Sequence, residues 1–225
     1  EQTLHFEKIK KFFDFKNGKY ILSTDQSYKT LLNPKLSDAI FFTTNKFLAS
    51  PLEIVLYANF TSPFAKDAVN NLASLIEKYP NRQTVVLKHY TNSEKDFNLA
   101  VAYNCYMQQE VDPLKAFNMI TSDIEGVLAD SPKQLDRRLQ NHTRKLGINR
   151  ASFVNCYNED TTTKQTVRNH LQEANSLGIT AVPTLLINRN IVQGSPNLED
   201  LELLITEIAK NEGIVFFFFF ESDAE

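Results

Sequence analysis

The chain has 225 residues, of which 42% are hydrophobic, and its formal net charge at pH 7 is −3. A chain of this length can form one large domain, or one core domain that carries an insertion. The small net charge gives no reason to expect nucleic acid as a partner, and no apolar run reaches the roughly 20 residues that cross a bilayer. Because the chain begins at Glu1 rather than Met, we expect a processed secreted protein or a domain of a longer one.

Residues 1–50 are predicted to be an accessory N-terminal segment. Four apolar residues recur at helical spacing and indicate a short amphipathic helix: Phe6, Ile9, Phe12 and Phe13. The dipeptide Asn17-Gly18 is a turn signal that ends this helix. Short strands are predicted at 19–22 and 39–43, on either side of a polar helical turn over 25–32.

A strand, a helix and a second strand follow in close succession. Residues 52–60 form a nearly continuous apolar run, which is typical of a strand buried on both faces. The turn Thr61-Ser62-Pro63 begins the helix, because proline suits a first helical position where an N–H would be unpaired anyway. The apolar stripe of this helix is Ala65, Ala68, Val69, Leu72, Ala73 and Ile76. Residues 84–89 are the next strand, so these elements predict a βαβ unit with a right-handed crossover.

Between residues 93 and 177 the pattern is helical only. Helices are predicted at 94–109, 113–122, 132–146 and 162–177. Two of them begin with a capping residue followed by proline, at Asp112-Pro113 and Ser131-Pro132. Gly147 and Gly178 stand where helix C-terminal caps are expected.

The β pattern returns after Gly178, with strands predicted at 184–187 and 191–192. Asn197, with Asp200 three residues later, is expected to cap a final amphipathic helix. Its apolar positions are Leu201, Leu204, Ile205 and Ile208. Residues 213–225 are predicted to be a tail that contains the phenylalanine run Phe216–Phe220.

Two segments of this layout resemble the halves of a thioredoxin-fold active site. One is Thr61-Ser-Pro-Phe-Ala-Lys66, at the start of the first helix after a buried strand, and the other is the turn Val182-Pro183 before a later strand. The resemblance is closest to the DsbA-like branch of thiol-disulfide oxidoreductases. It implies an α/β thioredoxin fold with a helical insertion and an N-terminal extension, and a cis peptide bond at Pro183.

The resemblance also implies a division of the chain into parts. Residues 1–50 are the accessory segment, and residues 51–92 and 178–212 form the thioredoxin-like domain. Residues 93–177 form the helical insertion subdomain, and residues 213–225 form the tail.

The motif positions in this chain hold no cysteine. The DsbA pattern Phe-x-Cys-Pro-x-Cys places the two cysteines at Ser62 and Ala65, whereas the Cys-Gly-Pro-Cys pattern places them at Thr61 and Phe64. The second register is also similar to thioredoxin-like domains fused to vitamin K epoxide reductase proteins, and the choice between registers stays open. An alcohol is far too weak an acid to form the anion that attacks a disulfide, so we expect no exchange at this site.

Three functions follow from the resemblance. The first is a redox-inactive domain that binds peptide or protein in a groove formed by Ser62, Val182 and Pro183. The second is a thiol-disulfide oxidoreductase whose active-site cysteines have been replaced in this chain. The third is a glutathione transferase or isomerase similar to the kappa class, whose Ser-Pro-Tyr-Ala turn resembles Ser62-Pro-Phe-Ala65. Only the third requires a cofactor, glutathione, held by Ser62.

The same resemblance implies an extracytoplasmic location, periplasmic or secreted. We expect a peptide or protein client, no nucleic acid, and a possible tether to a membrane protein. With four scattered histidines and two cysteines, the sequence predicts no metal site.

The two cysteines, Cys105 and Cys156, form no spaced motif. The sequence favours two buried free thiols, because free cysteine is among the most buried residue types. A structural disulfide and a displaced redox pair stay open as alternatives.

Overall fold

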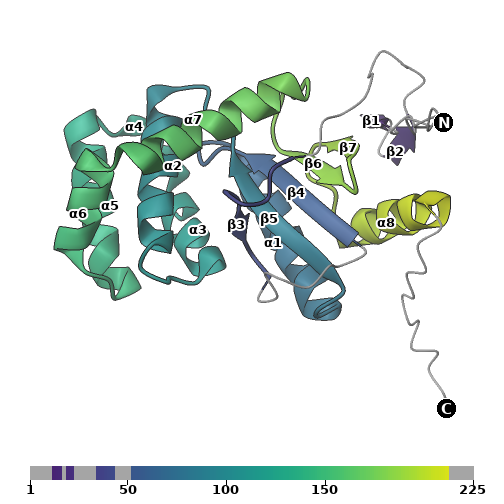
Figure 1. Ribbon diagram of the computed structural model, residues 1–225, viewed down its shortest axis with the longest axis horizontal. Helices are drawn as coiled ribbons and strands as arrows, with labels where there is room; N and C mark the ends of the chain where they lie inside the picture. The colour runs from purple at the N-terminus through teal and green to yellow at the C-terminus, as the bar shows by residue number, and fades with distance from the viewer. Residues whose placement is uncertain (1–11, 17–18, 23–33, 44–51, 213–225) are drawn as a thin grey trace, which may run out of the picture.

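The computed structural model describes residues 12–16, 19–22, 34–43 and 52–212. Phe6 and Ile9, the polar helical turn predicted at 25–32, and the tail at 213–225 lie outside these residues. The described part of the chain contains a mixed sheet with helices packed on both of its faces (Figure 1).

The strand β4 (Leu52–Ala58) lies in the interior of the sheet and confirms the strand predicted from the apolar run. It pairs in parallel with β5 (Gln83–His89) and antiparallel with β6 (Thr184–Ile187). The helix α1 (Pro63–Lys78) connects β4 to β5, so the predicted βαβ unit is present. The strand order in the described sheet is β2-β1-β7-β6-β4-β5-β3. The outer strands in this order are β1 (Phe12–Lys16), β2 (Lys19–Leu22), β3 (Ile40–Phe41) and β7 (Asn190–Gln193).

The two faces of the sheet are covered by different helices (Figure 1). Alternate residues of β4 point to opposite sides, as the period of two in a strand requires. Ile54 and Leu56 face the larger core, which contains the apolar sides of α1 and of the last helix. Val55 and Tyr57 face a smaller cluster that includes Ala174 near the end of the helix α7 (Thr161–Ser176). Burial on both faces explains why β4 reads as an uninterrupted apolar run.

The amphipathic helix predicted near the N-terminus is wrong where the structure describes it. Phe12 and Phe13 lie in the strand β1 (Phe12–Lys16), which pairs antiparallel with β2 (Lys19–Leu22) and parallel with β7 (Asn190–Gln193). The register places Lys16 opposite Lys19, so a two-residue connection joins the strands. Asn-Gly between β-forming residues is the strongest short hairpin signal, and it outweighs the helical spacing of the phenylalanines.

Six helices lie between β5 and β6. They are α2 (Glu94–Met107), α3 (Pro113–Thr121), α4 (Ile124–Ala129), α5 (Pro132–Leu146), α6 (Arg150–Glu159) and α7 (Thr161–Ser176). Four of them match predicted helices, but α4 and α6 were not predicted. Asp123 and Asn149 cap these two with side-chain oxygens that accept the N–H of Gly126 and of Ser152. Such short, weakly amphipathic helices depend on caps and on packing, so they carry little periodic signal.

The remaining elements agree with the sequence. The strand β3 (Ile40–Phe41) pairs antiparallel with β5 at the sheet edge, within the range predicted for a short strand. The last helix, α8, spans Leu198–Glu212, and Asn197 caps it by accepting the N–H of Asp200 at 2.9 Å. Within the described residues, no helix combines the length and apolar character needed to cross a membrane.

Candidate functional site

The motif segment forms the N-terminus of α1. Ser62 is the N-cap residue, with extended backbone, and Pro63 occupies the first turn. The Ser62 hydroxyl makes no capping hydrogen bond, while its carbonyl accepts the N–H of Ala65 at 3.1 Å. Ala65 is fully buried, whereas the side chain of Phe64 is 62% exposed. Three nearby motif positions therefore differ sharply: an unbonded hydroxyl, an exposed ring and a buried methyl group.

Thr61 is held by the carboxylate of Asp96, which no motif in the sequence singles out. Its Oγ1 donates to Oδ1 of Asp96 at 2.6 Å, and Asp96 is only 1% exposed. The other oxygen of Asp96 accepts the hydroxyl of Ser93, the N-cap residue of α2, at 2.7 Å. A charged group inside a protein requires such partners, so Asp96 fixes the Thr61 side chain toward α2. The available signal was weak, since an acidic residue in a first helical turn is common.

The second motif segment lies at the same end of the sheet. The peptide bond between Val182 and Pro183 is cis, as the resemblance implied. Pro183 directly precedes β6, whose first residue, Thr184, pairs with Tyr57 near the end of β4. From Tyr57 the chain continues through the end of β4 and reaches Ser62 five residues later. Both motif segments therefore lie beyond the same end of these two antiparallel strands.

The backbone around Pro183 is only partly used by the fold. The Pro183 carbonyl accepts the N–H of Gly194 at 2.9 Å. Within the described residues, no backbone hydrogen bond reaches the N–H or the carbonyl of Val182. The Val182 side chain is half-buried and packs against the smaller cluster of the sheet. An unpaired backbone unit beside a helix N-terminus can accept an added extended strand.

A shallow cavity of about 400 Å³ lies beside the start of α1. Pro63, Lys66 and Asp67 line it from α1, and residues 121–125 line it from the end of α3 to the start of α4. The exposed ring of Phe64 stands in the same first turn of α1. The motif segment therefore faces an open, mixed polar and apolar surface rather than a closed pocket.

Two of the four histidines, His89 and His170, lie together in the core close to Phe60, which precedes the motif turn. The rings of His89 and His170 have centroids 5.4 Å apart, and the backbone N–H of His89 donates to Nδ1 of His170 at 3.2 Å. The His89 ring is also 5.7 Å from that of Phe60. Complete burial, together with the neighbouring His170, holds the pKa of His89 well below its ordinary value. His89 is therefore a neutral core residue.

A buried ammonium group on β5 joins three distant segments next to His170. Nζ of Lys88, whose side chain is fully buried, lies 2.7 Å from Oε1 of Glu173 and 3.1 Å from Oδ1 of Asp38. Tyr57 donates its hydroxyl to the same oxygen of Glu173. Burial opposes ionisation of Asp38, but hydrogen bonds to His170 and Lys88 outweigh it and hold the pKa of this carboxyl well below its usual range. The cluster ties residues 34–43 and α7 to the sheet.

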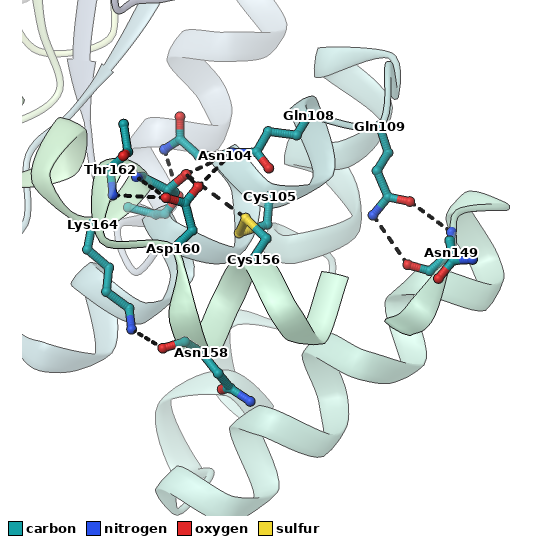
Figure 2. The surroundings of a disulfide bond; sticks show 12 residues. Asn104, Cys105, Gln108, Gln109, Asn149, Cys156, Asn158, Asp160, Thr162 and Lys164 are labelled. Atoms are coloured by element: carbon teal, nitrogen blue, oxygen red, sulfur yellow. Dashed lines mark hydrogen bonds between the residues drawn. A yellow bond between two sulfur atoms is a disulfide. The ribbon is translucent and has the colours of Figure 1, made fainter. Parts of the chain in front are cut away.

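The prediction of two free thiols is wrong. Cys105 in α2 and Cys156 in α6 form a disulfide with a Cα–Cα distance of 5.8 Å, and both residues are buried (Figure 2). The packing of α2 against α6 brings together positions 51 residues apart, which no local pattern reveals. Figure 2 also shows Asp160, where α6 meets α7, accepting hydrogen bonds from Gln108 and from the backbone of Thr162. Asp160 thereby helps to fix the helices that carry the disulfide.

Comparison with protein families gives a match over most of the chain. A family model described as thioredoxin matches residues 48–207, which is more than half of the sequence. These residues contain both motif segments. Comparison with curated proteins gives no match.

Solved structures show the same fold. The α-DsbA1 protein of Wolbachia pipientis is 20% identical with a TM-score of 0.64, and the match covers 79% of this chain and 94% of that one. A thioredoxin-like oxidoreductase from Silicibacter pomeroyi is 15% identical with a TM-score of 0.61, covering 77% of this chain and 94% of that one. A periplasmic thioredoxin-like protein from Salmonella enterica is 17% identical with a TM-score of 0.57, covering 76% and 89%. At these identities the likeness concerns the fold.

Proposed function

Because this chain belongs to the thioredoxin family and has the DsbA-like form of its fold, we propose that it is a redox-inactive member that binds extended polypeptide. The binding site is the groove formed by Ser62 at the start of α1 and by Val182 and Pro183 before β6. Affinity comes from non-covalent contacts, and no disulfide is exchanged.

One observation carries this proposal: the chain has no thiol at the motif. The sequence contains two cysteines, and both are joined in the buried disulfide between Cys105 and Cys156. The N-cap position, where a helix N-terminus stabilises a thiolate, is occupied by Ser62 instead. What the fold retains at this end of the sheet is a surface for binding.

The groove offers two kinds of contact to a polypeptide. The backbone of Val182 can donate and accept main-chain hydrogen bonds, which bind an extended segment regardless of its sequence. The exposed ring of Phe64 adds an apolar surface in the first turn of α1. Large exposed apolar side chains near an open cavity are typical of sites that bind protein partners. The client that fits is therefore an extended segment with apolar side chains.

An extracytoplasmic location accords with this proposal. Disulfides persist in oxidising compartments and are rare in the cytosol, and this chain contains one between α2 and α6. The similar protein from Salmonella enterica is described as periplasmic. A tether to a membrane protein remains part of the proposal.

An oxidoreductase whose cysteines have been replaced is the second candidate. The observation that favours it is the geometry of Ser62 and Ala65, which stand at the N-cap and one turn later, in the register of Cys-Pro-x-Cys. A pair of cysteines at these positions would have a thiolate at the helix N-terminus and a buried partner within reach.

A glutathione-dependent enzyme is the third candidate, and it rests on the hydroxyl of Ser62. This hydroxyl makes no capping bond and lies at the positive end of the α1 dipole, where it can donate to a bound thiolate. In this proposal Ser62 holds glutathione, and calorimetric titration with glutathione would give no heat if the proposal is wrong.

Binding of an unfolded polypeptide tests the first candidate. The probe is reduced and carboxymethylated α-lactalbumin, an unfolded chain without free thiols, and binding is measured by fluorescence anisotropy. We expect Phe64→Ser to raise the dissociation constant at least about tenfold, because burial of an aromatic side chain on binding contributes about 1.5–3 kcal/mol. Failure of the unmodified chain to bind the probe would contradict the proposal.

Leu203→Ser is the matched control. Leu203 is 63% exposed on α8, against 62% for Phe64, so both changes remove an exposed apolar side chain. Binding that weakens equally in both variants would indicate nonspecific apolar contact and not a groove.

Catalysis is tested separately by a peptide-oxidation assay in a glutathione redox buffer, in which no activity is expected. Activity that disappears in Cys105→Ala would place redox chemistry at the helical disulfide instead.

A further inference from the structure

A cavity of about 880 Å³ lies on the helical insertion, away from the motif segments. Residues of α5 and the first residue of α6 line most of it. Its charged lining comprises five cationic side chains and one carboxylate: Arg137, Arg138, Arg144, Lys145, Arg150 and Asp130. The chain as a whole has a net charge of −3, so positive charge is concentrated at this place.

Most of these cations have no acidic partner. Arg138 is neutralised, because its guanidinium lies 2.5 Å from Asp130 and 2.8 Å from Asp123. Within the described residues, no carboxylate lies within salt-bridge distance of Arg137, Arg144, Lys145 or Arg150. Arg150 donates instead to the amide oxygen of Gln140 at 2.6 Å, which orients its guanidinium without neutralising it. Four positive groups around one cavity repel one another unless an anion screens them.

A buried histidine is the second observation. His142 lines the cavity, is only 6% exposed, and its Nδ1 is buried without a hydrogen-bond partner within the described residues. Burial, followed by the charges of Lys145 and Arg138, lowers the pKa of His142 to about 4. Its imidazole is therefore neutral at pH 7, and its titration is sensitive to the positive potential of the cavity. His142 therefore places an unpartnered, buried polar atom next to the unpaired cations of the cavity.

We propose that this cavity binds a phosphate-bearing anion. Guanidinium groups bind phosphate oxygens through paired, charge-assisted hydrogen bonds, and Arg137, Arg144 and Arg150 supply three of them. Lys145 adds a fourth positive charge near His142. The phosphate can belong to a soluble molecule or to a lipid headgroup, because both present negatively charged phosphate oxygens to the guanidinium groups. This site is separate from the groove at Pro183 and does not depend on the function proposed there.

Titration with inorganic pyrophosphate tests the proposal. Binding is measured by calorimetry at constant ionic strength, and the side-chain resonances of His142 are followed by NMR as the pH is varied. We expect saturable binding and a rise in the pKa of His142, because a bound anion offsets the neighbouring cations. We expect Arg137→Gln/Arg144→Gln to weaken binding at least about tenfold, since each loses charge-assisted hydrogen bonds to phosphate. Glutamine keeps the helix propensity at both exposed positions.

Lys115→Gln/Lys210→Gln is the matched control. It removes two exposed positive charges from α3 and α8, outside the cavity, and should bind pyrophosphate as the unmodified chain does.

Vesicles of phosphatidylcholine with and without phosphatidylglycerol distinguish the source of the phosphate. Binding to either probe that is lost in Arg137→Gln/Arg144→Gln supports the site, and the probe that binds identifies the source. Absence of binding to both, or binding unaffected by this variant, would overturn the proposal.

Discussion

At the scale of single residues, the first turn of α1 distinguishes two possible motif registers. Ser62 is the N-cap residue with a hydroxyl that makes no capping bond, and Ala65 is buried one turn later. In the alternative register, Thr61 is bonded to the Asp96 carboxylate and Phe64 is turned out to solvent. A thiolate needs the positive end of the helix and is destabilised by a neighbouring carboxylate. The side-chain environments therefore favour Ser62 and Ala65 as the positions suited to redox chemistry.

Restoring cysteines tests this difference. We expect Ser62→Cys/Ala65→Cys to form a disulfide that a glutathione buffer reduces, and the pKa of the thiol introduced at position 62 to lie below the ordinary value of about 8.5. We expect Thr61→Cys/Phe64→Cys to form no such pair, because Asp96 disfavours the thiolate and the side chain at position 64 points into solvent. Thiol quantification after equilibration at several glutathione ratios gives the result. A reducible pair in neither variant would remove the support for an oxidoreductase with replaced cysteines.

At the scale of elements, the helical insertion depends on a covalent link. The helices α4 and α6 have little amphipathic signal of their own, and α6 contributes Phe153 and Cys156 to the core. The disulfide to Cys105 fixes α6 against α2 (Figure 2). The short helix α6 thus becomes stable through its packing and its link to a longer, more deeply buried helix.

Removing that link should lower stability substantially. We expect Cys105→Ala/Cys156→Ala to reduce the free energy of unfolding by about 2–4 kcal/mol, because the disulfide constrains a long loop of the unfolded chain. The two cysteines are 51 positions apart. Urea unfolding, monitored by circular dichroism, measures the effect. Reductant should destabilise the unmodified chain to the same extent and leave the double variant unchanged; a double variant as stable as the oxidised chain would contradict the expectation.

At the scale of the whole molecule, burial of ionisable groups links stability to pH. His89 and His142 are held neutral in the fold, since burial first and neighbouring charges second lower the pKa of each, that of His142 to about 4. In the unfolded chain both titrate near pH 6.5. Below that pH the unfolded state binds more protons than the folded state, so acid favours unfolding. Asp38, whose carboxyl pKa is depressed, contributes stability that is lost only at lower pH, below about 4.

The free energy of unfolding should therefore fall as the pH is lowered from about 7.5 to about 5, with a limiting slope of about 1.4 kcal/mol per pH unit for each neutral histidine. Urea unfolding at several pH values measures this slope. His142→Gln should lower the slope by about 1.4 kcal/mol per pH unit, because it removes one of the two imidazoles that the fold holds neutral. A stability that stays constant over this range would show that neither histidine is held neutral.

Local chemistry made much of the fold predictable. The apolar run of β4, the proline at the start of α1 and the Asn197 cap of α8 are each signals within a few residues. Hydrophobic period, capping and turn residues act over one or two helical turns, so a sequence reveals them directly. The motif segments and the absence of thiols at them are likewise properties of the sequence.

Long-range contacts decided the rest. Phe12 and Phe13 lie in a strand because β2 and β7 are available to pair with it, although their spacing fits a helix. Cys105 and Cys156 are joined because α2 packs on α6, and Thr61 is fixed because Asp96 lies beside it at the start of another helix. Each of these features requires residues far apart in the chain to meet, and only the folded backbone determines which of them do.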